Sequence, residues 1–442
     1  MSAAQLRREL GPWDVLALMM GITIGAGVFA MPGRVAEYFP SFGWIAVVWV
    51  GAAAFALIGN LVYAELGARL PHTGGEYVYL HRAFGPLPAF LFGWSQLLVV
   101  RTNPVAALPL VFAEYASSLV RLEETERLML AAALILMLGA VNYLGLRSGK
   151  GVQLVTSVLK VGGMVAFVAA AVLTLSEYGP NLASAHAPPQ KLGPLGNTAR
   201  ALLLVVFAYV GWDRVGYLAG EMRRPERDLP RALVGGSILV AVLYLSMNFI
   251  YYAALPIGAI SGSRVPAADV ARLLWGQAGP VLVALLVMVS TLGATNGNIM
   301  ASSRVYYTMA RDGLFPGVFG RVHPRWQSPH VAIILHCGWA LALLFAGRRV
   351  ETLVGSFVFA ALIFWGASTV ALFRFRRREA AAPFLTPGYP LAPAVFLVAV
   401  AALVAATCYF SPRSAFTNLA LMGSGLPFYW AWRKLSRDRA AA

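Results

Sequence analysis

Cysteine and charged residues are both scarce in this chain of 442 residues. The two cysteines, Cys337 and Cys408, lie in apolar segments, which excludes a disulfide framework. The six histidines show no metal-ligand spacing, so we expect no metal and no other cofactor. Charged residues make up 12% of the chain, about half of their share in a soluble domain. The chain is therefore predicted to be a membrane protein.

Long apolar runs dominate the sequence instead. A helix needs about 20 predominantly apolar residues to cross the hydrocarbon core of a bilayer. Twelve runs approach or exceed that length, which predicts a single all-α polytopic transmembrane domain over residues 1–442. The predicted spans are 13–38, 43–67, 85–119, 127–146, 151–175, 198–220, 231–254, 279–308, 330–346, 351–373, 391–410 and 415–432.

Basic residues are distributed unevenly between the loops. The formal net charge of +16 could suggest a nucleic-acid partner, but most Lys and Arg lie at the two termini and in every second loop. Loops rich in Lys and Arg stay in the cytoplasm. We therefore expect a multi-pass protein of the plasma membrane, with both termini cytoplasmic and no nucleic-acid partner. Five basic residues lie inside predicted spans: Arg101, Lys160, Arg200, Arg214 and Arg304.

The stretch Gly21–Phe29 lies within the first predicted span and holds three glycines. Glycine costs about 1 kcal/mol against alanine inside a helix, and a bilayer tolerates a broken helix only where its backbone faces protein, water or a ligand. We interpret Gly25–Gly27 as an unwound segment at mid-membrane depth. The N–H groups after it suit a carboxylate, and the carbonyls before it suit an ammonium. A packing face of small residues is the alternative.

A second interruption, Phe207–Trp212, lies in the sixth predicted span. Five spans separate the two breaks, so the second group of five spans enters the membrane from the opposite side. This pattern is typical of transporters built from inverted repeats, with a mid-membrane site between two discontinuous helices. We predict a first repeat over 13–175, a second over 198–373 and two additional helices over 391–432.

Further motifs follow one another in a fixed order along the chain. They are Phe84–Phe90 with Leu97–Arg101, Phe207–Trp212 with Glu221-Met222, Arg224–Pro230, and Asn296-Gly297 with Ser302–Arg304 and Arg311–Gly313. Together with the first break, they resemble the amino acid–polyamine–organocation (APC) superfamily, and within it the L-type amino acid transporters. The likeness covers nearly the whole chain. It implies a LeuT-like fold of five plus five inverted helices, with helices 1 and 6 discontinuous, and two further helices.

The resemblance also implies which residues hold an amino acid. The carboxylate would meet the N–H groups of Ala26 and Gly27, and the ammonium would meet the carbonyls of Thr23, Phe207 and Val210. Phe207 would also close over the substrate as an aromatic gate, and a residue of the eighth span would line the pocket. The expected substrate-binding residues are Thr23, Gly25, Ala26, Gly27, Phe207, Ala208, Tyr209, Val210, Gly211 and Asn296.

Two positions depart from the family pattern. Val210 stands where human L-type members with large neutral substrates have glycine, and it should shrink the pocket toward small or medium neutral amino acids. Asp213 stands where those members often have asparagine. The sequence leaves two roles open for Asp213. It either influences which substrate charge is accepted or simply pairs with the neighbouring Arg214.

Lys160 lies about ten residues from either end of the fifth span, or about 15 Å of helix. A lysine side chain cannot reach either interface over that distance, so its ammonium must meet polar groups inside the bundle. In sodium-independent members of the superfamily, a matching lysine takes the place of a sodium ion. The predicted partners are the carbonyl of Gly21 or Ile22 and the region of residues 290–291. We interpret Lys160 as a fixed cation, with a proton carrier as the alternative.

We expect structural roles for Arg101 and Arg304. Arg101 precedes Pro104, which frees a carbonyl on the preceding turn, and we expect the arginine to satisfy that carbonyl or to bind a neighbouring helix. Arg304, near the cytoplasmic end of the eighth span, is expected to reach the interface or to form a cytoplasmic gate pair.

These observations predict a sodium-independent amino acid transporter that works by alternating access, with obligate exchange as the family tendency. Proton-coupled uptake is the main alternative. An intramembrane enzyme is not supported because no nucleophile can be paired with a base, and a channel would need a polar pore stripe that the spans lack.

Human relatives bind a glycoprotein subunit through a cysteine after the third span. Residues 120–126 contain no cysteine, so we expect no disulfide-linked subunit.

Overall fold

The computed structural model describes residues 6–175, 181–185, 187–188, 193–347, 357–379 and 381–441. The predicted start of the tenth span, 351–356, lies outside these residues. Helices form the fold, and within the described ranges the one β pairing is an isolated parallel bridge between Leu10 and Met222. The predicted all-α class is therefore confirmed.

The helices of the first half are α1 (Pro12–Thr23), α2 (Gly27–Ala36), α3 (Phe42–Arg69), α4 (Glu76–Phe84), α5 (Pro86–Ser95), the π-helix η1 (Gln96–Val100), α6 (Thr102–Ser117), α7 (Glu124–Tyr143) and α8 (Leu146–Leu175). Those of the second half are α9 (Gly193–Tyr209), the 3-10 helix η2 (Trp212–Glu221), α10 (Pro225–Ala254), α11 (Ile257–Ser261), α12 (Pro266–Trp275), α13 (Ala278–Arg311), the 3-10 turn η3 (Gly317–Gly320), α14 (His330–Gly347) and α16 (Phe357–Arg378). Three more follow: α17 (Leu391–Phe410), α18 (Pro412–Gly423) and α19 (Gly425–Ala441).

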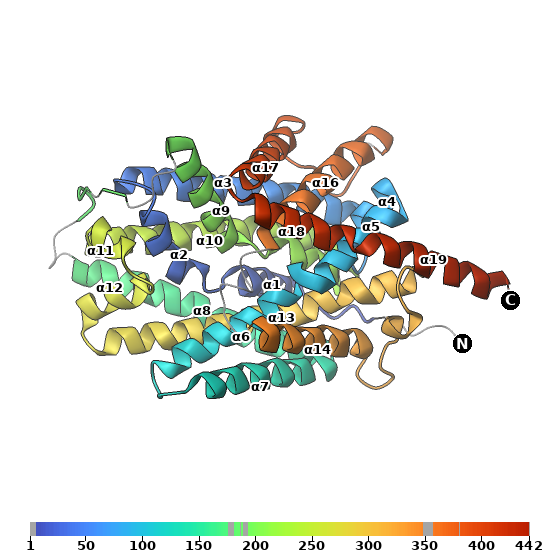
Figure 1. Cartoon of the computed structure of the whole chain (residues 1–442), viewed down its shortest axis with the longest axis horizontal. Helices are drawn as coiled ribbons and strands as arrows, with labels where there is room; N and C mark the ends of the chain where they lie inside the picture. The colour runs from blue at the N-terminus through green and yellow to red at the C-terminus, as the bar shows by residue number, and fades with distance from the viewer. Residues whose placement is uncertain are drawn as a thin grey trace.

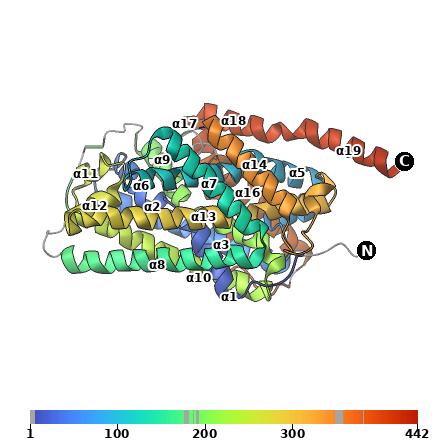
Figure 2. The same ribbon diagram turned by 90° about the horizontal axis from the view of Figure 1, so that it is seen from below.

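Most of the long helices run roughly parallel or antiparallel along the longest axis of the molecule (Figure 1). The segment that leads into α1 and the last helix, α19, lie toward one end of the bundle in both views, while α11 and α12 lie at the opposite end (Figures 1 and 2). The start of α1 and helix α19 thus lie at the same end of the bundle. The distribution of basic residues between the loops predicts the same arrangement, with both termini on one side.

Ten helical stretches among the described residues are long and apolar enough to cross a membrane. They agree with ten of the twelve predicted spans. The two others fall on α7 and on the pair α18 and α19, which is divided near Ser424. Helix α7 nevertheless packs along α6 and α14 within the bundle.

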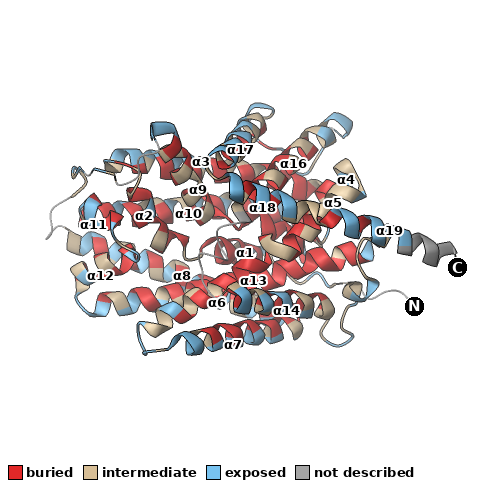
Figure 3. Cartoon of the chain, in the orientation of Figure 1, coloured by how far each residue is buried: buried red, intermediate tan, exposed pale blue. Residues whose placement is uncertain are grey.

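The two halves of the chain pack against each other element by element. Helix α10 lies along α3, and α13 lies along α6, so the second and third elements of the predicted repeats pair across the molecule. Helices α1 and α13 are mostly buried at the centre, whereas α17 and α19 expose much of their surface (Figure 3). The two interrupted helices, α1–α2 and α9–η2, are also mostly buried and therefore lie inside a shell of other helices.

Candidate functional site

Both predicted helix breaks are present. Helix α1 ends at Thr23 and α2 begins at Gly27, and between them Ile24 adopts an extended backbone with φ −79° and ψ 92°. Helix α9 ends at Tyr209, and the chain turns into η2 through Gly211, whose φ is +138°. Side chains other than hydrogen rarely allow that backbone, so the second break depends on a glycine.

The two breaks pack directly against each other. A Cβ atom on Gly27 would lie 2.8 Å from the Cα of Ala208, and one on Gly211 would lie 2.9 Å from the carbonyl oxygen of Ile22. Neither distance allows a side chain. The glycines are therefore needed for the close crossing of two interrupted helices, which brings the residues predicted from both halves of the chain into one place.

A space remains beside the first break. A Cβ atom on Gly25 would have its nearest neighbour, the Cδ2 atom of Leu108, 4.0 Å away. Gly25, Ala26 and Phe207 are partly exposed, whereas the other seven predicted binding residues are buried. The backbone at the start of α2 therefore borders an opening, and the aromatic ring predicted to act as a gate lies at a partly exposed position of α9.

Lys160 anchors the end of α1. Its side chain is fully buried, and its Nζ donates to the carbonyls of Gly21 at 2.9 Å, Ile24 at 2.9 Å and Ser290 at 3.0 Å. Gly21 and Ser290 are partners that the sequence predicts, and Ile24 is an additional partner that it does not. An ammonium has three hydrogens and finds three carbonyls here, so the geometry fits a charged lysine that joins α8, α1 and α13.

Two hydroxyl groups complete the support of the break. The Oγ of Ser290 lies 2.9 Å from the carbonyl oxygen of Ile24 and 3.2 Å from that of Gly25. The hydroxyl of Tyr244, on α10, lies 3.2 Å from the carbonyls of both Thr23 and Ala208. Because a hydroxyl has one hydrogen, each of these side chains donates to one carbonyl at a time. Tyr244 is not among the residues predicted from the sequence, although a buried tyrosine in an apolar span needs a polar partner.

Asn296 is placed differently from the prediction. Its side chain donates to the carbonyl of Gly149 and to the Oε1 of Gln153, both at 2.9 Å, and accepts from Asn142 at 2.9 Å. These partners belong to α7 and α8, so the amide ties α13 to that side of the bundle and does not face the opening at Gly25. Gly297, the next residue, is the one that faces α1, with Ile22 as its nearest neighbour. This arrangement gives Asn296 a structural role and not the pocket-lining one expected from the resemblance.

The arrangement can hold a zwitterion but has no chemistry for bond cleavage. The N–H groups at the start of α2 lie beside Gly25, and the carbonyls of Thr23, Phe207 and Val210 lie near the ends of α1 and α9. Groups of these two kinds suit a carboxylate and an ammonium. Within the described ranges, no three His, Cys, Asp or Glu side chains gather in a way that could hold a metal ion. Binding and passage of a small charged molecule is the activity that fits.

Comparison with known proteins decides the class. Residues 10–431 match the family model for amino acid permeases. The chain belongs to the amino acid permease family. It is 31% identical over 433 residues to b(0,+)-type amino acid transporter 1 of Homo sapiens, covering 96% of this chain and 88% of that protein. It is 28% identical over 434 residues to the serine/threonine exchanger SteT of Bacillus subtilis (strain 168), covering 97% and 98%.

A third relative, the cystine/glutamate transporter of Homo sapiens, is 26% identical over 445 residues, covering 98% of this chain and 87% of that protein. The predicted resemblance to the APC superfamily and its L-type members is thus confirmed. This permease is a multi-pass amino acid transporter, and it is not an enzyme.

A buried charge network lies beside the second break of the permease. Arg101 donates to the carboxylate of Asp213, and its Nη2 also donates to the hydroxyl of Tyr217 at 2.8 Å. Trp365 donates to the same Asp213 oxygen at 3.1 Å. Arg101 therefore takes the neighbouring-helix role predicted for it. The main partner of Asp213 is Arg101, because the Nε of the adjacent Arg214 is 3.9 Å away.

Glu76 adds a second carboxylate to this network. It accepts from the hydroxyl groups of Tyr63, Tyr217 and Ser368, and lies 3.8 Å from the Nη2 of Arg101. It belongs to α4, which is not among the ten apolar spans. Burial, reinforced by the Asp213 carboxylate, raises the pKa of Glu76 above its usual range, and Arg101 opposes this shift. The sequence analysis did not single out Glu76.

The far end of η2 is fixed by another ion pair. Arg304 of α13 donates through Nε and Nη2 to the two carboxylate oxygens of Glu221, at 2.8 and 2.9 Å, and both side chains are buried. This bidentate pair is the gate-like contact that was one of the two expectations for Arg304. At the near end of η2, Arg214 donates to the Oδ1 of Asn298 on the same helix α13. The 3-10 segment is therefore held to α13 at both of its ends.

Proposed function

We propose that this permease exchanges small or medium neutral amino acids by alternating access, without sodium. The observation that carries the proposal is the Lys160 ammonium, held by three carbonyls at the end of α1 and on α13. A monovalent cation in that position would be coordinated by such oxygens. Because a covalently attached cation is already present, the broken helix needs no bound sodium ion to keep its shape.

The substrate is proposed to lie at the opening beside Gly25. Its carboxylate meets the N–H groups of Ala26 and Gly27, where the positive dipole end of α2 begins. Its ammonium meets the carbonyls of Thr23, Phe207 and Val210 at the ends of the two half-helices. Support comes from the absence, among the described residues, of any neighbour closer than 4.0 Å to a Cβ atom on Gly25 and from the partial exposure of Gly25, Ala26 and Phe207.

Alternating access is supported by the packing of the two halves. The proposed inverted repeats, 13–175 and 198–373, place α3 against α10 and α6 against α13. In transporters of this design, one group of helices rocks against the other around a fixed mid-membrane site. The additional helices, 391–432, lie outside the repeats.

Substrate size is proposed to depend on Val210. This buried side chain follows Tyr209 at the end of α9 and adds apolar volume beside the second break. The relative whose printed name is serine/threonine exchanger covers nearly the whole chain, and its named substrates are small. We therefore assign alanine, serine, threonine and valine as the class to test first.

Proton-coupled uptake is the second candidate. It rests on the position of Lys160, a titratable side chain that is fully buried within the site. The three carbonyl partners favour the fixed cation, since a neutral amine has only two hydrogens and would leave one carbonyl without its donor.

The remaining proposals concern placement in the cell. The arginine-rich end of the bundle, with both termini, is proposed to face the cytoplasm of a plasma-membrane protein. No disulfide-linked subunit is proposed, because Cys337 is buried and Cys408, although exposed, lies on α17 and not after the third span.

Uptake of a labelled amino-acid panel into proteoliposomes tests the function. Vesicles loaded with unlabelled serine or alanine should take up the same amino acids many times faster than empty vesicles, with saturation. Equal uptake by loaded and empty vesicles would contradict exchange. Uptake driven by an inward proton gradient into empty vesicles would favour the second candidate.

A further inference from the structure

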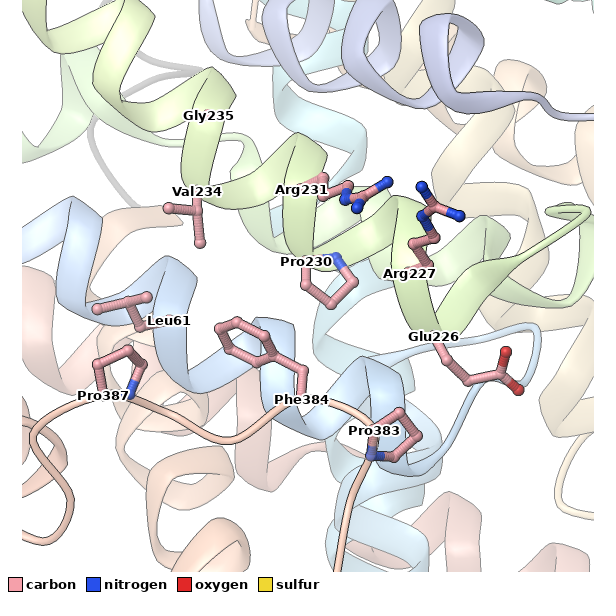
Figure 4. A pocket seen from close by; sticks show the side chains of 10 residues that line it. All are labelled: Leu61, Glu226, Arg227, Pro230, Arg231, Val234, Gly235, Pro383, Phe384 and Pro387. Carbon is pink, nitrogen blue, oxygen red and sulfur yellow. The ribbon is translucent and has the colours of Figure 1, made fainter.

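A groove of about 610 Å³ opens on the surface of the bundle, away from the substrate site. It lies between α3, the first turns of α10 and the segment 383–387 that precedes α17 (Figure 4). Its apolar wall includes Leu61, Pro230, Val234 and Phe384. Two arginines of α10, Arg227 and Arg231, complete the lining together with Glu226 at the rim.

The groove lies at the depth where a bilayer changes from hydrocarbon to headgroups. Residues 232–254 of α10 carry no charge, and at 1.5 Å per residue they span roughly 35 Å, close to the thickness of the hydrocarbon core. Arg231 is the charged residue that directly precedes this stretch. On the antiparallel helix α3, residues 42–64 are uncharged in the same way, and Leu61 lies near their end.

An apolar surface of α10 continues from the groove toward the middle of the membrane. Its exposed side chains include Ile238 and Leu239, one helical turn beyond Val234 and Gly235, and Val242 on the next turn. An acyl chain that begins in the groove can therefore continue along the outer surface of α10, in contact with lipid.

The charges of the groove favour an anion. Arg227 and Arg231 are one helical turn apart, and both are exposed. No carboxylate pairs with either of them within the described residues, whereas nearby Arg224 lies 3.9 Å from Asp228. Figure 4 shows the two guanidinium groups beside each other on one side of α10, and the Glu226 carboxylate apart from them, on the side of Pro383. Two neighbouring guanidinium groups are well suited to a phosphate diester.

We propose that this groove binds one anionic phospholipid. Arg227 and Arg231 hold its phosphate, and Leu61, Val234 and Phe384 receive the beginning of an acyl chain. Basic pockets between transmembrane helices at a membrane interface commonly bind anionic headgroups. A free phosphate would use the arginines alone, so the apolar wall is the feature that selects a lipid.

Native mass spectrometry of the purified protein, titrated with phosphatidylglycerol or phosphatidylcholine in detergent, tests this proposal. Two variants remove the two parts of the site. Arg227→Gln with Arg231→Gln removes the positive charges. Gly235→Leu fills the groove, since a Cβ atom on Gly235 meets nothing within 4 Å. The matched controls are Arg311→Gln with Arg321→Gln, two exposed arginines elsewhere, and Gly235→Ala.

We expect the unmodified protein to retain one phosphatidylglycerol at least tenfold more tightly than phosphatidylcholine. The arginine pair variant and Gly235→Leu should each lose most of that preference, and both controls should keep it. Equal retention of the two lipids would overturn the proposal. So would unchanged binding in Gly235→Leu, or displacement of the lipid by inorganic phosphate at comparable concentration, because either result would show that the apolar wall is not used.

Discussion

Single side chains hold the first helix break of this permease in place. Lys160 supplies a covalently attached positive charge to the end of α1, and Ser290 contributes both its carbonyl and its hydroxyl to the same place. Unpaired polar groups cost several kcal/mol in a membrane interior. The carbonyls of Gly21 and Ile24 therefore depend on this lysine, and so does the geometry of the break.

Replacement of Lys160 by alanine should lower substrate affinity by at least about tenfold, or about 1.4 kcal/mol. The variant loses the donor for three carbonyls, so the residues before Gly25 lose their fixed position. Lys150→Ala is the control, because Lys150 also joins α8 to the start of α1, through Asp14 at 3.0 Å, but is partly exposed. Equilibrium binding of labelled substrate measures the effect. Equal affinities of the two variants would refute the anchoring role.

The charge state of Lys160 can be examined through pH. A fixed cation predicts homoexchange that is nearly flat between about pH 6 and 8, since an ordinary lysine titrates near 10.4. A proton carrier must gain and lose its proton within the working range, and uptake should then acidify the vesicle interior. Proton flux that accompanies substrate and disappears in Lys160→Ala would establish the carrier role and reverse our preference.

Val210 is expected to set the upper limit of substrate size. Val210→Gly removes apolar volume at the end of α9, and larger amino acids such as leucine should gain up to about 1–3 kcal/mol of binding for each group newly accommodated. Competition against labelled alanine gives the ranking for both proteins. Tighter binding of tryptophan than of alanine by the unmodified protein would show that Val210 does not limit the pocket.

At the scale of helices, two glycines of the first break have different tolerances to substitution. A Cβ atom on Gly27 would lie 2.8 Å from Ala208, whereas a Cβ atom on Gly25 would make only an ordinary contact with Leu108 at 4.0 Å. Gly27→Val should therefore separate the half-helices and lower the melting temperature. Gly25→Val should fold normally and lose substrate binding, because its side chain occupies the proposed carboxylate position. Thermal unfolding and substrate binding, measured on both variants, separate these effects. Normal affinity in Gly25→Val would move the substrate elsewhere.

The Arg101 and Asp213 pair connects the η1–α6 region to η2. Breaking a buried ion pair from one side leaves an uncompensated charge and costs about 3–5 kcal/mol. We expect Arg101→Gln to be strongly destabilising, and addition of Asp213→Asn to restore part of the loss. Chemical or thermal unfolding of the two single variants and the double variant provides the cycle. Additive losses would mean that the two side chains do not depend on each other.

The helix breaks could be predicted from the sequence because glycine-rich interruptions in apolar runs have few physical explanations. The burial of the Lys160 ammonium could be predicted because distance along a helix fixes its depth, whereas its partners Gly21 and Ser290 followed from the family resemblance. The orientation of Asn296 could not, since successive residues differ by about 100° around a helix and the rotation of α13 is set by its packing. Tyr244 and Glu76 could not be identified either, because their partners come from segments far away in the chain.

At the scale of the whole molecule, two interrupted helices cross at glycines inside a bundle, and a lysine holds one of them in place. Two buried ion pairs near the centre, Arg101 with Asp213 and Arg304 with Glu221, join η2 to its neighbours. Substrate is therefore the charged species expected to enter and leave the centre, while the protein charges stay fixed.

The most direct test of this account is the sodium dependence of exchange in proteoliposomes. Vesicles loaded with labelled serine should release it when unlabelled serine is added outside, at the same rate in sodium chloride and in choline chloride. That result is predicted because Lys160 already provides the cation at the broken helix. A several-fold acceleration by sodium would contradict the central claim.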